Sequence, residues 1–148
     1  MPFEVEIPSA NGSGTGSPTG IVYNGSNEFR ASIFLFATLD GTISGWAPQS
    51  DPNNAIIAVT AAGAVYTGLA ITSRTSGNFL FAADNANNKV DVYDGKFNLV
   101  KTFTDKTLPA GFAPFGIQDF GGLVYVAFAG SSGAGGATST SSAKMEHS

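Results

Sequence analysis

The hydrophobic pattern is clearest between Ile33 and Trp46, where two apolar runs flank one polar turn. Residues 33–39 are nearly all apolar, which is typical of a strand covered on both faces. Asp40 and Gly41 follow, and a second run extends from Thr42 to Trp46. An Asp-Gly pair between apolar runs predicts a two-residue type I′ turn, because both residues tolerate a positive φ. The segment therefore predicts a β-hairpin.

The same pattern repeats along the chain. The motifs PTGIVYN, YTGLAIT and PFGIQDF place Gly20, Gly68 and Gly116 at intervals of 48 residues. An aromatic-rich strand follows each glycine, and in the first two units the next strand ends at Trp46 or Tyr93. A further strand type is expected at residues 55–59 and 99–103, and residues 3–7 resemble it. Units of four strands that recur every 40–50 residues or so are typical of β-propeller blades.

The sequence thus predicts an all-β fold of four-stranded antiparallel propeller blades, about 48 residues each, in a partial or incomplete propeller. The expected parts are an outer strand of a preceding blade (1–10), a Gly/Ser linker (11–17), two blades (18–62 and 63–110), a half blade (111–129) and a disordered tail (130–148). The tail is rich in Gly, Ser and Thr, which bury little apolar surface. The open ends of such a stack leave strand edges unpaired, which predicts self-association.

One apolar stretch has nearly the length of a membrane span. It runs from Ala55 to Ile71 and contains many β-branched residues, together with Gly63 and Gly68. β-branched residues favour strands, and glycine interrupts a helix. We therefore expect two strands and a turn here, and no membrane span.

Composition excludes several function classes. Charged residues make up 12% of the chain and the net charge is −4, which argues against a nucleic-acid partner because phosphates require clustered Lys and Arg. The chain has no cysteine, so disulfides and thiolate metal sites are excluded. Its single histidine, His147, lies in the predicted tail, so the folded part cannot supply a Ser/His or Cys/His pair. The N-terminal residues lack the basic and apolar regions of a secretory signal.

Two carboxylates occupy matching turns. Asp40 and Asp84 follow equivalent strands, and such loop carboxylates can bind a central metal ion in ring-shaped enzymes. Turn chemistry is the favoured alternative, because Asp hydrogen-bonds nearby backbone groups. Side-chain oxygens in the SDPNN segment could likewise bind Ca²⁺, and a turn that begins at the proline is again the favoured alternative. The residues concerned are Asp51, Asn53 and Asn54. Apart from this option of Ca²⁺, no cofactor is expected.

A second set of residues could contact a ligand. Aromatic side chains that end inner strands could line a groove, and an arginine before a strand could meet an acidic group. Packing between blades and solvated loops are the favoured alternatives. The ligand candidates are Trp46, Tyr93, Phe115 and Arg74, with Phe112 and Arg30 as further members of the set.

Four segments carry a resemblance to a known family. They are SPTGIVYN, FLFATLDGTISGWAP, GNFLFAADNANNKVDVYDGKFN and FTDKTLPAGFAPFGIQ, within residues 3–129. They resemble an uncharacterised family of bacterial β-propeller proteins, usually secreted, with blades related to NHL-type and YVTN-type repeats. Members of that family are longer and carry an export signal. The resemblance implies that this chain is a partial member and is extracytoplasmic or secreted, and it supplies no activity or functional residues.

The sequence supports three hypotheses about function. The first is a non-catalytic propeller scaffold or binding module, whose protein or small-molecule ligand the sequence does not identify. The second is a metal-dependent enzyme of the propeller hydrolase or lactonase type, which requires Asp, Asn and Glu side chains that converge on a central axis. The third is a truncated fragment without an independent function. No catalytic residue is predicted.

Overall fold

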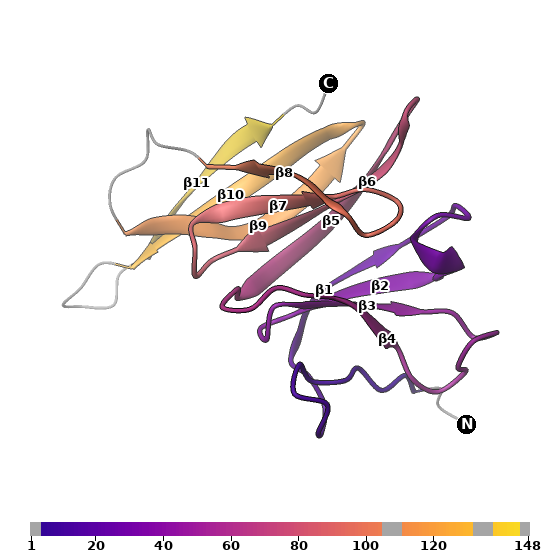
Figure 1. The fold of residues 1–148 in the computed structure, drawn as a ribbon. Coiled ribbons are helices and arrows are strands. Elements are labelled where there is room, and N and C mark those ends of the chain that lie inside the picture. The colour runs from indigo at the N-terminus through magenta and orange to yellow at the C-terminus, as the bar shows by residue number, and fades with distance from the viewer. Residues whose placement is uncertain (1–3, 105–110, 132–137, 146–148) are drawn as a thin grey trace.

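The computed structural model describes residues 4–104, 111–131 and 138–145, which form three antiparallel sheets arranged side by side (Figure 1). Sheet 1 consists of β1 (Pro18–Tyr23), β2 (Phe34–Thr38), β3 (Thr42–Trp46) and β4 (Ile56–Thr60). Sheet 2 consists of β5 (Tyr66–Arg74), β6 (Gly77–Asp84), β7 (Lys89–Tyr93) and β8 (Leu99–Phe103). Sheet 3 consists of β9 (Phe112–Phe120), β10 (Leu123–Ser131) and β11 (Thr138–Met145). The only helical element among the described residues is the short 3₁₀ turn η1 (Phe29–Ala31).

The first strands of the three sheets lie next to one another. β5 contacts β1 on one side and β9 on the other. Repeated hydrogen bonds join them: the Thr19 hydroxyl donates to the Tyr66 carbonyl at 2.6 Å, and the Thr67 hydroxyl donates to the Pro114 carbonyl at 3.4 Å. The 48-residue repeat therefore builds both junctions from equivalent positions. The described residues do not close a ring.

Two apolar clusters fill the spaces between the sheets. One lies between sheets 1 and 2 and includes Leu35, Ile43, Leu69 and Leu80. The other lies between sheets 2 and 3 and includes residues of both, namely Ala70, Phe81, Val90, Val92, Val124, Val126 and Phe128. Sheet 2 thus has both faces covered, whereas sheets 1 and 3 each share only one face with another sheet.

The predicted hairpin is confirmed, but the predicted turn type is wrong. β2 and β3 pair from Phe34 opposite Trp46 to Ala37 opposite Ile43. The turn closes through a hydrogen bond from Gly41 N to Thr38 O, and Gly41 has a φ of +81°. Asp40 does not have a positive φ. The loop therefore has three residues, with the glycine in the left-handed position, rather than a two-residue type I′ turn.

The apolar stretch from Ala55 to Ile71 forms β4 and the first part of β5, as predicted. In the described part of the chain, no helix has the length and hydropathy needed to cross a membrane. The inner strands of the hairpins are buried as expected. β3 and β7 are also largely buried, whereas β4 is partly exposed and β8 is exposed.

Both ends of the chain differ from their predictions. Residues 4–7 form no strand of a preceding blade; Glu6 instead makes one parallel bridge with Asn54, and Val5 and Ile7 cover part of sheet 1. Within the tail that was predicted to be disordered, residues 138–145 form β11, which pairs with β10. The unpaired edge of β10 explains the difference, because it offers backbone partners to a segment with few apolar side chains. The rest of the predicted tail, 132–137 and 146–148, lies outside the described residues.

Candidate functional site

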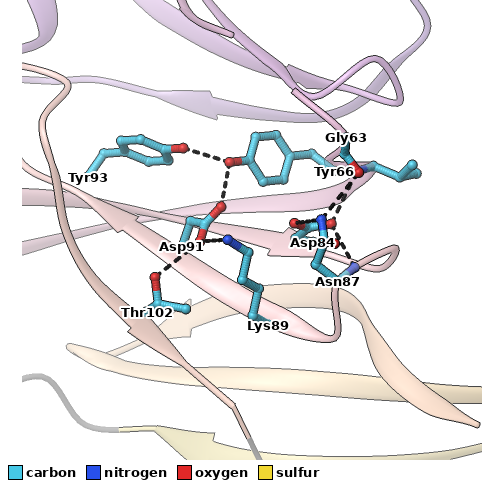
Figure 2. Close-up of polar contacts among 9 residues, drawn as sticks. Gly63, Tyr66, Asp84, Asn87, Lys89, Asp91, Tyr93 and Thr102 are labelled. Carbon is cyan, nitrogen blue, oxygen red and sulfur yellow. Dashed lines mark hydrogen bonds and ion pairs between the residues drawn. The ribbon is translucent and has the colours of Figure 1, made fainter. Parts of the chain in front are cut away.

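A buried polar network lies at the centre of sheet 2 (Figure 2). The Tyr66 hydroxyl on β5 donates to Asp91 Oδ2 on β7 at 2.7 Å, and it lies 2.6 Å from the Tyr93 hydroxyl. Because Tyr66 has one proton and gives it to Asp91, the Tyr93 hydroxyl donates to Tyr66. Thr102 on β8 donates to Asp91 Oδ1 at 3.3 Å. The network connects three of the four strands of the sheet.

The charge of Asp91 is compensated within this network. Asp91 is 1% exposed, and Lys89 Nζ lies 3.2 Å from its Oδ1 atom. A buried carboxylate is tolerated only when cationic and hydrogen-bonding partners replace water. Both oxygens of Asp91 have such partners, so the geometry gives this carboxylate a structural role.

Burial changes the ionisation of the two tyrosines. It raises the pKa of Tyr66 far above the ordinary value, and the hydrogen bonds to Tyr93 and Asp91 act in the same direction. Burial also raises the pKa of Tyr93. A neutral hydroxyl is therefore favoured at both positions, which suits a hydrogen-bond donor and opposes a nucleophilic phenolate.

Asp84 lies at the end of β6 and is fully buried. Its carboxylate accepts hydrogen bonds from Val65 N at 3.1 Å, from Asn87 N at 3.2 Å and from Asn87 Nδ2 at 2.8 Å. Asn87 Nδ2 also donates to Gly63 O at 3.2 Å (Figure 2). Asp84 thus fastens the loop before β5 to the turn that follows β6.

Asp40, the other metal candidate, is exposed in sheet 1 and accepts a hydrogen bond from Ala10 N at 3.1 Å. Asp51 accepts hydrogen bonds from Asn53 N and Asn54 N at 2.9 and 3.1 Å, and these backbone bonds lower its pKa. The described residues contain no group of three or more His, Cys, Asp or Glu side chains that could hold a metal ion. The structure therefore places Asp40 and Asp84 in separate sheets, each with backbone donors.

The ligand candidates do not lie at one place. Trp46 is buried, stacks on Phe34 with ring centroids 6.1 Å apart, and donates to Pro52 O at 3.2 Å. Tyr93 belongs to the buried network. Phe115 is 54% exposed on β9, and Arg74 is half-buried at the end of β5. Arg74 Nε and Nη2 are buried atoms without a hydrogen-bond partner.

Arg30 and Phe112 extend this set. The Arg30 guanidinium lies 5.4 Å from the centroid of the Phe97 ring, where η1 meets sheet 2. Phe112 packs against the cluster between sheets 2 and 3. Both are therefore accounted for by contacts between neighbouring sheets.

A groove runs along the inner strands of all three sheets. It has a volume of about 400 Å³ and is lined by residues of β1, β5 and β9. Its lining combines apolar side chains with Gln118 and Asp119, and Asp119 Oδ1 is a buried atom without a hydrogen-bond partner. Sequence reasoning did not identify this groove. The repeat motifs did indicate its strands, because each motif lies within or at the start of one of them.

Comparison with known proteins found relatives in a virus. The chain is 32% identical over 128 residues to uncharacterized protein R640 of Acanthamoeba polyphaga mimivirus, a match of 75% of this chain and 23% of that protein. It is 28% identical over 130 residues to uncharacterized protein R648 of the same virus, covering 76% of this chain and 32% of that protein. The chain thus spans about a quarter to a third of the relatives it matches. No family model matches the sequence.

These relatives overturn the resemblance to a bacterial family. They point to viral proteins, and neither the bacterial origin nor the NHL-type and YVTN-type repeats are supported. The sequence motifs were misleading because glycine and aromatic positions set by blade packing can recur in unrelated propellers. The expectation that the chain is secreted rested on that resemblance alone, and it stays an untested prediction.

Solved structures support a propeller-like fold. A chain of the nidogen/laminin complex aligns with a TM-score of 0.55 and 16% identity, covering 84% of this chain and 46% of that chain. A chain from BBS1N in complex with ARL6DN aligns with a TM-score of 0.52 and 15% identity, covering 99% and 43% of the two chains. The all-β, propeller-like architecture is therefore confirmed, although the part of the chain that the structure describes forms no closed propeller.

Proposed function

We propose that this chain is a non-catalytic binding module of propeller-type sheets, which contacts another protein through its inner strands and open sheet faces. The observation that carries the proposal is the exposure of large apolar side chains on β1 and β9. Ile21 and Tyr23 on β1 are 60% and 65% exposed, and Phe115 and Phe120 on β9 are 54% and 56% exposed. Exposed apolar side chains of this size, two on each strand, are a feature of interaction surfaces.

The groove between these strands supports the same function. It brings Ile21, Tyr23 and Ile71 together with Gln118 and Asp119. Binding sites commonly combine an apolar lining with a few polar groups that fix orientation. The unpartnered oxygen of Asp119 would supply such a group for a donor on the ligand. The two solved relatives in fold are known from complexes, which agrees with a role in binding.

A fluorescent dye for apolar surfaces tests the proposal. We expect the dye bis-ANS to bind the dilute chain, and Ile21→Ser combined with Phe115→Ser to reduce its fluorescence severalfold. Val100→Ser is the matched control, because Val100 is 49% exposed on the outer strand β8. Equal fluorescence for both variants would contradict a binding surface on the inner strands.

Calorimetry separates this function from the metal-dependent enzyme. A binding module that needs no metal gives no saturable heat when Ca²⁺ or Zn²⁺ is added. A tight site with one ion per chain that is lost in Asp84→Asn would instead favour the enzyme, because Asp84 is the buried metal candidate. Asp40→Asn provides the comparison at the exposed turn of sheet 1.

A further inference from the structure

The same contact between neighbouring sheets occurs twice, between sheets 1 and 2 and between sheets 2 and 3. The face of sheet 3 that points away from sheet 2 has the residues for a third contact of this kind. On the strand after each repeat glycine, equivalent positions hold Leu35 in β2, Phe81 in β6 and Tyr125 in β10, as the strand registers show. Leu35 and Phe81 are 0% and 1% exposed because the next sheet covers them. Tyr125 is half-buried, on a face that no other sheet of the described residues covers.

The space around the three repeat glycines also differs between the covered sheets and sheet 3. A methyl group added at Gly20 would lie 2.8 Å from the Leu69 nitrogen in the next sheet. One added at Gly68 would lie 3.1 Å from the Phe115 oxygen. At Gly116 the nearest atom is Ala127 Cβ of its own sheet, at 3.8 Å. Gly116 therefore leaves room for a neighbouring strand, and no strand of another sheet fills that room.

The face of sheet 1 that points away from sheet 2 presents the matching side chain, and Val5 and Ile7 cover only the part of this face beside Phe36. Leu69 and Ile117 follow the repeat glycines of β5 and β9, and both pack against the preceding sheet. Their equivalent in β1 is Ile21, which is 60% exposed. Beside it lies a mainly apolar groove of about 380 Å³ that includes Pro18, Ile21 and Phe36. Ile21 of sheet 1 could therefore pack over Gly116 of sheet 3, as Leu69 packs over Gly20.

We propose that a second copy of this chain docks head to tail, with its Ile21 placed over Gly116 of the first copy. This inference rests on the proposed function, because it uses the same exposed inner strands. The docked strands repeat the existing junctions, in which Leu69 lies over Gly20 and Ile117 over Gly68. The residues that line the groove beside Ile21 carry no charge, so this side of the contact does not repel a second copy.

The number of sheets selects a dimer. The described residues of each chain provide three sheets, so two copies give six, whereas three copies give nine. Propellers typically have about 4–8 blades. Two chains can therefore close a ring in which sheet 3 of each copy meets sheet 1 of the other. Both contacts are heterologous, because two different faces of the chain meet.

Two blocking variants test this arrangement. Gly116→Val fills the open space on sheet 3, and Ile21→Glu places a charge on the free face of sheet 1. We expect the wild-type chain to have the mass of two copies in light scattering and sedimentation, and each variant to have the mass of one. Val100→Glu on β8 is the control and stays a dimer, since Val100 lies on an outer strand.

Mixing the two variants gives the decisive result. Gly116→Val keeps an intact sheet 1 face and Ile21→Glu keeps an intact sheet 3 face, so an equimolar mixture forms a heterodimer with one contact. This heterodimer dissociates at a higher concentration than the wild-type ring, which has two contacts. Should Gly116→Val fail to fold by circular dichroism, Gln118→Arg on the same exposed face replaces it.

Three results would overturn the proposal. They are a monomeric wild-type chain at all concentrations tested, a dimer in either variant alone, and a mixture of folded variants that stays monomeric. A dimer in one variant alone would mean that like faces meet. The dye experiment is carried out on dilute monomer, so reduced dye binding together with a monomeric wild type would retain the binding function and reject this partner.

Discussion

The hydroxyl of Tyr66 links β5 to β7 through side-chain hydrogen bonds with Asp91 and Tyr93. Tyr66→Phe removes the donor to Asp91 and leaves a fully buried carboxylate oxygen with one partner fewer. We expect the free energy of unfolding to fall by about 1–3 kcal/mol, the usual cost of an unsatisfied buried group. Denaturant unfolding measures it. Tyr23→Phe is the control, because Tyr23 is 65% exposed, and an equal effect of both changes would argue against the network.

The raised pKa of Tyr66 predicts a pH dependence. In the unfolded chain this hydroxyl ionises near its ordinary pKa of 10.0, whereas burial in the folded chain keeps it protonated to higher pH. The resulting stability is fully present below pH 10 and is lost progressively as the pH rises above 10, because only the unfolded state releases the proton. Melting temperatures between pH 8 and 11 should therefore fall more steeply for the wild type than for Tyr66→Phe. Parallel curves would contradict this assignment.

Single residues of the site were harder to predict than the strands that hold them. Asp40 and Asp84 were identified from their turn positions, and the structure gives each of them backbone donors. The pairing of Tyr66 with Asp91 spans β6, where the small side chain of Ala82 lies directly opposite Asp91. No local pattern indicates such a contact, because it depends on the register of three strands.

At the scale of the strands, two repeat glycines, Gly20 and Gly68, allow neighbouring sheets to pack closely. Gly20→Ala and Gly68→Ala place a methyl group against the backbone of the next sheet, and overpacking of this kind costs about 1–3 kcal/mol. Gly116→Ala meets no atom closer than 3.8 Å and restricts only the unfolded chain, so stability should stay equal or rise slightly. Thermal unfolding of the three variants, at a concentration where the chain is monomeric, compares them directly. A loss of stability in Gly116→Ala as large as in Gly20→Ala would contradict the open space beside Gly116.

The period of the sequence predicted most of these strands. The motifs that begin at Pro18 and Tyr66 start β1 and β5, and the aromatic residues Trp46 and Tyr93 end β3 and β7. Buried strands dominate the hydrophobic pattern, which explains this success. β11 carries few apolar residues, and its pairing depends on the open edge of β10. That edge is a property of the assembled sheet, which the pattern of β11 alone does not contain.

At the scale of the whole molecule, the order of the sheets determines which part opens first. Sheet 2 is covered on both faces, by one cluster towards sheet 1 and by another towards sheet 3. Local opening costs most where apolar contacts are densest, so the amides of β6 around Leu80 and Phe81 should exchange with solvent most slowly. Amides of β1 and β9 should exchange faster. Hydrogen exchange followed by mass spectrometry or NMR measures this gradient, and uniform protection across the three sheets would contradict it.

Hydrogen exchange measured at several protein concentrations locates the contact between copies. If sheet 3 of one copy covers sheet 1 of another, then raising the concentration protects β1 and β9, because these strands form the new junction. The outer strands β4 and β8 lie away from the inner-strand junctions and should keep their exchange rates, and β6 is already covered within the chain. Contact through the outer strand edges would produce the opposite pattern, with protection in β4 and β8 and none in β1. The exchange rates thus distinguish stacking of sheet faces from pairing of strand edges, the two ways in which an open stack of blades can associate.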